Sequence, residues 1–291
     1  MAKIRRTKRK TPVTRLAAPA SPSCSSSKPA ATRKVIRRFH VLSKRQIQLR
    51  KLLSSRREGL SSDALKVKEE LAAIEQEIDD MGGLEAYQKM SVIGQGNDRG
   101  GGSEKVLIGW LHELNYPKRM EAEKLRVLEV GALKPDNYAS CSTWIDVTPI
   151  DLHSRHPAIQ EQNFLLMDEE EHHEQWDLIS LSLVVNFVPE PKDRGRMLQL
   201  AHAMLKPGQY VFLALPLSCV MNSRYCTPDH IEGLMNVLSF KQIKTRWREG
   251  GKMAYWLFQK ITPVVPLDAT LYQKKTVLRT GNDRNNFSIL L

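Results

Sequence analysis

The chain has 291 residues, of which 41% are hydrophobic, enough for one sizeable folded domain with appendages. No apolar run approaches the ~18 residues that a membrane helix needs, and the N-terminus is basic rather than signal-like. The four cysteines form no C-x-x-C pair and no Cys/His spacing typical of zinc, which favours a reduced compartment and no metal.

The net charge of +12 is concentrated at the N-terminus. Residues 1–57 contain 18 Lys and Arg and no Asp or Glu, so the remaining 26 basic and 32 acidic residues give the rest of the chain a charge of about −6. We expect residues 1–57 to be a basic, largely disordered tail. Such a tail is typical of nucleic-acid binding, with Arg5, Arg6, Arg37 and Arg38 as candidate RNA contacts. A tail that acts only as a nuclear or nucleolar targeting signal is the alternative.

Residues 58–98 are expected to form a helical arm. Apolar residues recur at steps of three and four from about Ser62 to Met81, and Gly82 with Gly83 ends that helix. The arm is expected either to extend an RNA-binding surface or to pack on the domain that follows.

A glycine-rich loop opens the segment 99–291. Ser103 follows Gly100, Gly101 and Gly102 and is suited to cap a helix. Free backbone N–H groups at a helix N-terminus can bind an anion, and Arg99 is a candidate partner for a ligand carboxylate. A plain linker is the alternative.

Residues 126–151 carry the clearest ligand-binding pattern. An apolar run stops at Gly131, and the carboxylate of Asp151 follows twenty residues later. In a doubly wound sheet, a glycine at this place lets a nucleoside approach the backbone, and an acid at the end of the next strand binds the ribose. A dinucleotide would require G-x-G-x-x-G. We therefore favour S-adenosylmethionine, which lacks a pyrophosphate; an ordinary strand ended by a turn is the alternative.

Strands and helices alternate over the rest of the chain. Further strands are expected at residues 159–167, 176–185 and 210–217, helices at 193–205 and after Thr227, a hairpin at 240–248 and 252–260, and a last strand at 286–291. This pattern predicts an α/β fold, a Rossmann-like class I S-adenosylmethionine-dependent methyltransferase domain over residues 99–291. The donor-site candidates are Gly131, Asp151, Glu129, Arg99 and Asn163.

Several segments resemble a known family. LEVGALKPDNY, IDLHS, DLISLSLVVNFVPEPKDRGRML, LPLSCVMNSRY and RNNFSIL are similar to a fungal methyltransferase family that modifies N(1) of an adenine in 25S ribosomal RNA. The resemblance covers roughly residues 87–291. It implies donor binding by Gly131 and Asp151 and a nucleolar location. The family is also similar to an animal S-adenosylmethionine sensor, so a donor-binding sensor or scaffold without catalysis is the alternative function.

The segment Asn186-Phe187-Val188-Pro189 is the candidate site for the target base. It only partly resembles the N-P-P-Y/F motif of adenine-amino methyltransferases, which argues against chemistry at N6. Asn186 is expected to orient the base and Phe187 to stack on it; a capped loop and a core aromatic are the alternatives. Asn222 and Arg224 are candidate RNA contacts. A methyltransferase acting on protein or a small molecule is less favoured, and a nicotinamide enzyme is least favoured.

Overall fold

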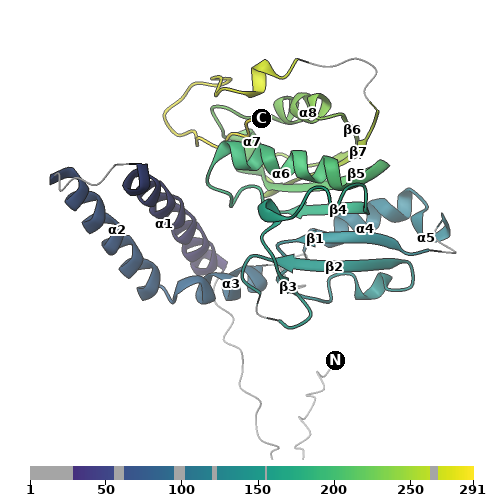
Figure 1. The fold of residues 1–291 in the computed structure, drawn as a ribbon, viewed down its shortest axis with the longest axis horizontal. Helices are drawn as coiled ribbons and strands as arrows, with labels where there is room; N and C mark the ends of the chain where they lie inside the picture. Colours follow the sequence, from purple (N-terminus) through teal and green to yellow (C-terminus); the bar gives the residue numbers. More distant parts are fainter. Residues whose placement is uncertain (1–28, 56–61, 95–101, 120–122, 155, 263–267) are drawn as a thin grey trace, which may run out of the picture.

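The computed structural model describes residues 29–55, 62–94, 102–119, 123–154, 156–262 and 268–291 (Figure 1). Within these ranges a seven-stranded sheet has the order β3-β2-β1-β4-β5-β7-β6. The strands are β1 (Leu125–Val130), β2 (Ile145–Asp151), β3 (Gln160–Glu161), β4 (Trp176–Ser182), β5 (Leu205–Pro216), β6 (Phe240–Arg246) and β7 (Met253–Lys260). The first five are parallel, whereas β7 is antiparallel to both β5 and β6. The predicted α/β fold, with a largely parallel, doubly wound sheet, is therefore confirmed.

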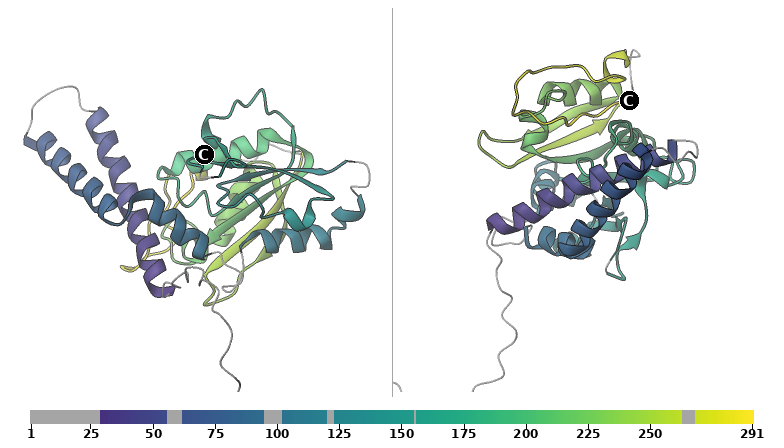
Figure 2. Two further views of the ribbon diagram at one scale, coloured as in Figure 1. Left: turned by 90° about the horizontal axis from the view of Figure 1, so that it is seen from below. Right: turned by 90° about the vertical axis from the view of Figure 1, so that its left-hand side faces the viewer.

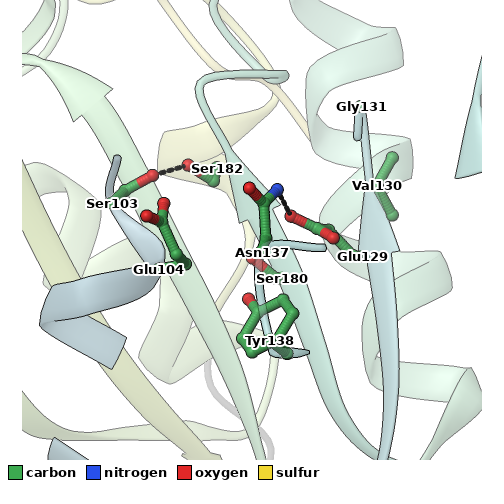
Figure 3. A pocket seen from close by; sticks show the side chains of 9 residues that line it. All are labelled: Ser103, Glu104, Glu129, Val130, Gly131, Asn137, Tyr138, Ser180 and Ser182. Carbon is green, nitrogen blue, oxygen red and sulfur yellow. Dashed lines mark hydrogen bonds between the residues drawn. The ribbon is translucent and has the colours of Figure 1, made fainter. Parts of the chain in front are cut away.

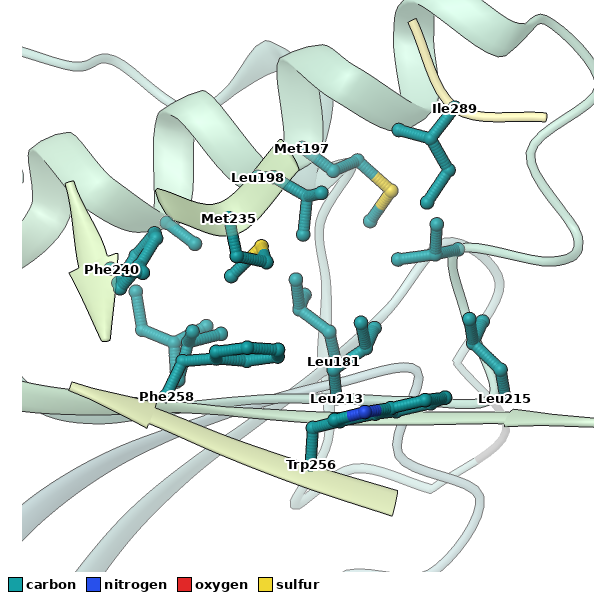
Figure 4. Packing of buried hydrophobic residues seen from close by; sticks show 14 of the residues in the cluster. Leu181, Met197, Leu198, Leu213, Leu215, Met235, Phe240, Trp256, Phe258 and Ile289 are labelled. Carbon is teal, nitrogen blue, oxygen red and sulfur yellow. The ribbon is translucent and has the colours of Figure 1, made fainter. Parts of the chain in front are cut away.

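Alternation along the central strands builds two apolar layers. Leu128 and Val130 of β1 belong to one cluster of buried side chains, while Leu125 and Val127 belong to the other. The same alternation repeats on β4 and β5, as expected when successive side chains point to opposite faces. Figure 4 shows the first cluster, in which Leu213 and Trp256 of the sheet face Met197 and Leu198 of α6.

Helices cover both faces of the sheet (Figures 1 and 2). The first cluster includes residues of α6 (Pro191–Met204) and α8 (Pro228–Val237), and the second includes residues of α4 (Glu104–Glu113) and α5 (Tyr116–Arg119). A short helix, α7 (Leu217–Met221), follows β5 directly. The expected cap before α8 is present, because the Thr227 side chain accepts a hydrogen bond from the His230 N–H. Among the described residues, no helix is both long and apolar enough to span a membrane.

The expected strand at residues 159–167 is mostly a turn. Only Gln160 and Glu161 pair with β2, and a 3₁₀ turn at Phe164–Leu166 follows. The Asn163 side chain caps that turn by accepting a hydrogen bond from the Leu165 N–H. A residue that bonds its own neighbouring backbone in this way competes with strand pairing.

The expected disorder does not extend over residues 29–55, which form helix α1 (Pro29–Ser55). α1 packs with α2 (Ser62–Asp80) and α3 (Gly83–Gly94), the two helices of the expected arm, and α1 and α2 lie side by side (Figures 1 and 2). From here on, the helical arm means all three helices. Leu42, Leu49 and Ile74 form its small core. Three arginines of α1 form ion pairs with glutamates of α2: Arg38 with Glu77, Arg45 with Glu70, and Arg50 with Glu75. The amino-acid composition of residues 1–57 could not predict these contacts, because they join segments that are distant in sequence.

The C-terminal segment packs in the core without forming the expected strand. Ile289 is fully buried, the Leu290 N–H donates to the Pro191 carbonyl at 2.9 Å, and the Arg194 guanidinium donates to the Ser288 carbonyl at 2.6 Å. The backbone is thus held by helix α6 rather than by the sheet.

Candidate functional site

Gly131 directly follows β1 at the carboxyl edge of the sheet, beside the point where the strand order reverses between β1 and β4. Its φ is +77°, a conformation that side-chain-bearing residues rarely adopt. Its N–H donates to the Ile150 carbonyl at 2.8 Å. A Cβ added at Gly131 would lie 3.0 Å from Cγ2 of Val184. The position therefore favours glycine because of its backbone conformation, and an added Cβ would also press against Val184.

Glu129 lies two residues earlier and is 7% exposed. Its Oε1 accepts a hydrogen bond from Asn137 Nδ2 at 2.7 Å, whereas its Oε2 is buried and finds no hydrogen-bond partner among the described residues. Burial, with smaller contributions from Glu104 and Asp136, raises the pKa of Glu129 to about 7. A buried acceptor left unpaired is costly, so this carboxylate is suited to a ligand that brings a donor.

A pocket surrounds this carboxylate (Figure 3). The helix that starts after Ser103 forms part of its wall, and the Ser103 hydroxyl is hydrogen-bonded to that of Ser182 at the end of β4. The residues that line the pocket are Ser103, Glu104, Glu129, Val130, Gly131, Asn137, Tyr138, Ser180 and Ser182.

Asp151 ends β2, next to Gly131 along the same edge. Its Oδ1 accepts a hydrogen bond from the His153 N–H at 3.0 Å, and burial raises its pKa. Asp146, the other carboxylate on β2, is exposed near the opposite end of the strand. The geometry thus favours Asp151 over Asp146 as a ligand-binding residue at the carboxyl edge.

Asn186 lies in the loop after β4 and is 5% exposed. Its Oδ1 is buried and, within the described ranges, has no hydrogen-bond partner. The loop begins at Leu183, whose φ of +59° is unusual for a branched side chain. The Arg194 guanidinium holds the loop's far end by donating to the carbonyls of Val188 and Pro189. A second unpaired acceptor therefore sits at the same edge as Glu129, in a braced loop.

Phe187 contacts the helical arm. Its ring centroid lies 4.0 Å from that of His40 on α1 and 5.6 Å from that of Tyr87 on α3. Phe39 stacks on Tyr87 at 4.6 Å. These contacts match the alternative in which Phe187 packs within the chain; stacking on a base stays a prediction.

Two candidate RNA contacts, Asn222 and Arg224, form hydrogen bonds within the chain. The Asn222 side chain donates to the Asp283 carbonyl, and Arg224 donates to the carbonyls of Gly281, Asn282 and Arg284 and to Asn286 Oδ1. Both side chains therefore hold the C-terminal segment, and their contact with RNA stays a prediction.

Three more candidates are placed as follows. Arg38 forms a two-pronged ion pair with Glu77 at 2.5 and 2.6 Å, Arg37 is exposed, and the Asn163 Oδ1 is committed to its cap. Arg5, Arg6 and Arg99 lie outside the described residues.

Sequence reasoning missed the contributions of Asn137, Tyr138 and the arm residues His40, Tyr87 and Gln88. Gln88 Nε2 donates to the His153 carbonyl, beside Asp151. No spacing pattern links these positions to the carboxyl edge. In the part of the chain that the structure describes, no group of three or more His, Cys, Asp or Glu could hold a metal ion.

The chain is similar in sequence to one family of rRNA methyltransferases. The family described as 25S rRNA (adenine(2142)-N(1))-methyltransferase, Bmt2, matches residues 72–289. The 25S rRNA adenine-N(1) methyltransferase of Schizosaccharomyces pombe is 34% identical over 265 residues, which cover 88% of this chain and 90% of that protein. The 25S rRNA (adenine(2142)-N(1))-methyltransferase of Saccharomyces cerevisiae is 34% identical over 225 residues, 76% of this chain and 64% of that protein.

Solved structures match more weakly. A 1,6-didemethyltoxoflavin-N1-methyltransferase from Burkholderia thailandensis, solved with bound S-adenosylhomocysteine, has 14% identity and a TM-score of 0.41, covering 55% of this chain and 87% of that one. A mutant 16S rRNA (adenine(1408)-N(1))-methyltransferase from Catenulisporales acidiphilia has 13% identity and a TM-score of 0.38, covering 51% and 91%.

Proposed function

The chain belongs to the 25S rRNA (adenine-N(1))-methyltransferase family, and we propose that it is itself an enzyme that methylates N(1) of an adenine in 25S rRNA with S-adenosylmethionine as donor. The observation that carries this proposal is a pair of buried acceptors, Glu129 Oε2 and Asn186 Oδ1, at one edge of the sheet, neither of which has a hydrogen-bond partner among the described residues. One faces the pocket beside Gly131, and the other lies in the loop after the neighbouring strand β4.

The residues present fit this donor. S-Adenosylmethionine supplies a sulfonium-bound, electrophilic methyl group and also carries an ammonium and two ribose hydroxyls. Glu129 Oε2 is suited to the ammonium, and Asp151 to the ribose hydroxyls. Gly131 leaves open the space that a Cβ would fill. These residues hold and orient the donor.

The target atom needs little activation. Adenine N(1) has an in-plane lone pair, so no general base is required before its bond to the methyl carbon forms as the carbon–sulfur bond breaks. The protein's contribution is positioning, which can lower a barrier by several kcal/mol, together with stabilisation of the cationic product. This is consistent with a site built from amides, carboxylates and a glycine.

Asn186 is the residue we assign to the base. Its unpaired Oδ1 can accept a hydrogen bond from the exocyclic amine at C6, which fixes the ring plane beside the donor. The same oxygen then faces the positive charge that develops on the methylated ring. N(1) lies on the pairing edge, so the adenine must be unpaired or extruded to reach Asn186.

The cellular setting follows from the substrate. We propose that the enzyme acts in the nucleolus, on pre-ribosomal particles, during ribosome biogenesis; a 25S rRNA substrate supports this proposal. The eight Lys and Arg within residues 1–28, with no Asp or Glu among them, support both nuclear targeting and contact with RNA phosphates.

The test is methyl transfer from labelled S-adenosylmethionine to 25S rRNA isolated from cells that lack the enzyme, followed by nucleoside analysis. Label in 1-methyladenosine is the expected result. Label in N6-methyladenosine would overturn the assignment of the atom, and the absence of label from the rRNA would overturn the assignment of the substrate.

A further inference from the structure

The turn between β6 and β7, residues 246–252, combines exposed cations with an exposed aromatic ring. Arg246, Arg248 and Lys252 are all exposed, and the Trp247 side chain retains 41% of its accessible surface. With Glu249 as the turn's one acidic residue, three positive charges and one negative charge leave a net charge of +2.

The cations of this turn differ in their ion pairing from three arginines of the arm. Among the described residues, none of the three is in an ion pair, whereas the arginines of α1 at positions 38, 45 and 50 are neutralised by glutamates of α2. Lys244, earlier on β6, is also paired, with Glu113. The three cations of the 246–252 turn are thus left available for a charged partner.

The strand register places the turn at the carboxyl edge of the sheet. Arg246 pairs with Tyr255, Met253 pairs with Pro216 at the end of β5, and the Leu217 N–H donates to the Lys252 carbonyl at 2.8 Å. Gly131, Asp151 and Asn186 lie along the same edge. From β4 to β6 there are three strand spacings, or about 14 Å.

We propose that the 246–252 turn binds the RNA strand that flanks the target adenine, with Trp247 stacking on an unpaired base and Arg246, Arg248 and Lys252 contacting phosphates. This inference rests on the proposed function. N(1) is reached only in an unpaired or extruded adenine, and in a single-stranded loop the bases next to that adenine are also available for stacking. A cationic surface with an aromatic platform is the usual means of binding such a strand.

An alternative role for the turn, protection of an edge strand from pairing with other chains, explains fewer of its features. β6 is an edge strand, and charges on an edge strand prevent it from pairing with other chains. That role accounts for the cations but not for a large exposed aromatic ring among them.

The test compares the variants Trp247→Ala, Trp247→Phe and Arg246→Ala/Arg248→Ala. Lys241→Ala is the matched control, because Lys241 is an exposed cation of the same strand near the opposite edge. The probe is unmethylated 25S rRNA, with affinity measured at several salt concentrations. Donor affinity and melting temperature are measured in parallel.

We expect Trp247→Ala to weaken RNA binding about tenfold, equivalent to about 1.4 kcal/mol, and Trp247→Phe to retain most of the affinity. Arg246→Ala/Arg248→Ala should flatten the salt dependence by roughly the slope of two phosphate contacts. Lys241→Ala should match the wild type. Donor affinity should be unchanged in every variant.

RNA affinity within twofold of the wild type for both Trp247→Ala and the double variant would overturn the inference, as would equal losses in Lys241→Ala. Failure of the proposed function looks different. RNA would then bind through the turn with no methyl transferred by the wild type, which would support the binding surface while contradicting the enzyme assignment.

Discussion

The His40 ring meets the Phe187 ring edge-on, with centroids 4.0 Å apart and planes 79° apart. This contact joins helix α1 to the loop that holds Asn186. Gln88 of α3 makes a second link, to the backbone just after Asp151. The helical arm therefore braces both the loop assigned to the base and the loop assigned to the donor.

The aromatic link should be measurable as a coupling energy. Burial lowers the pKa of His40 to about 4, so its ring is neutral at pH 7 and packs as an aromatic. In a double-mutant cycle with His40→Ala and Phe187→Ala, we expect a coupling of about 0.5–1.5 kcal/mol in the free energy of unfolding. If Phe187 instead stacks on the base, Phe187→Ala alone slows methyl transfer and the coupling is close to zero.

Gly131→Ala should reduce donor binding at least tenfold, and Gly131→Arg should abolish it. Gly208→Ala is the matched control, because Gly208 has the same φ of +77° but nothing lies within 4 Å of an added Cβ. Both alanine variants carry the backbone strain, so only the crowding beside Val184 and the donor distinguishes them. Calorimetric titration with the donor measures the difference; equal losses in both variants would remove Gly131 from the site.

Asp151→Ala should weaken donor binding by about 1.5–3 kcal/mol, the range for hydrogen bonds to a charged group. Asp146→Ala, on the same strand but near the opposite edge, should leave the affinity unchanged. The same titration compares them. A larger loss in Asp146→Ala would reverse the assignment of the ribose-binding carboxylate.

Glu129→Gln should change the pH dependence of both stability and binding. Burial raises the pKa of Glu129 from 4.5 to about 7, so the folded chain keeps a proton that the unfolded chain releases between these values. The free energy of unfolding of the ligand-free protein therefore falls as pH rises through this window, by up to about 3 kcal/mol.

The variant should lack this fall and bind the donor weakly at every pH. The wild type should bind less tightly as the pH drops below about 7, because the protonated acid no longer attracts an ammonium. Denaturant melts and donor titrations at several pH values test both statements. An unchanged pH dependence of stability in Glu129→Gln would mean that another group titrates.

Deletion of residues 1–28 should weaken binding to 25S rRNA and flatten its salt dependence, because eight cations are removed. The deletion stops before α1, so the arm and its contact with Phe187 are retained, and donor affinity should not change. Salt titrations of RNA binding provide the measurement. If the salt slope is unaltered, the segment serves as a targeting signal only.

The sequence predicted the elements whose signals are local. β1, β4 and the β6–β7 hairpin follow from short apolar runs closed by glycine or polar turns, and the rule that ligands bind at carboxyl edges brought Gly131 and Asp151 together. The extent of helix α1 was not predicted, because the helix is stabilised by Leu42 and Leu49 against α2 and by ion pairs to that helix. Each of these contacts depends on a partner distant in sequence.

Two further sets of contacts were not predicted for the same reason, since they also join residues that are distant in sequence. Arg224 is a candidate RNA contact after a strand, and four acceptors between residues 281 and 286 bind its guanidinium, which the sequence did not predict. The contacts of His40 and Tyr87 with Phe187 join segments that are 100 or more residues apart. Neither arrangement has a periodic or motif-like signature.

The most direct test of the account separates donor binding from methyl transfer. Single-turnover transfer to unmethylated 25S rRNA would be measured with saturating donor for the wild type, Asp151→Ala and Asn186→Ala, alongside donor affinity. We predict 1-methyladenosine formation by the wild type, weaker donor binding by Asp151→Ala, and slow transfer with intact donor affinity by Asn186→Ala. Tight donor binding by the wild type with no transfer to RNA would contradict the account and identify the chain as a donor sensor.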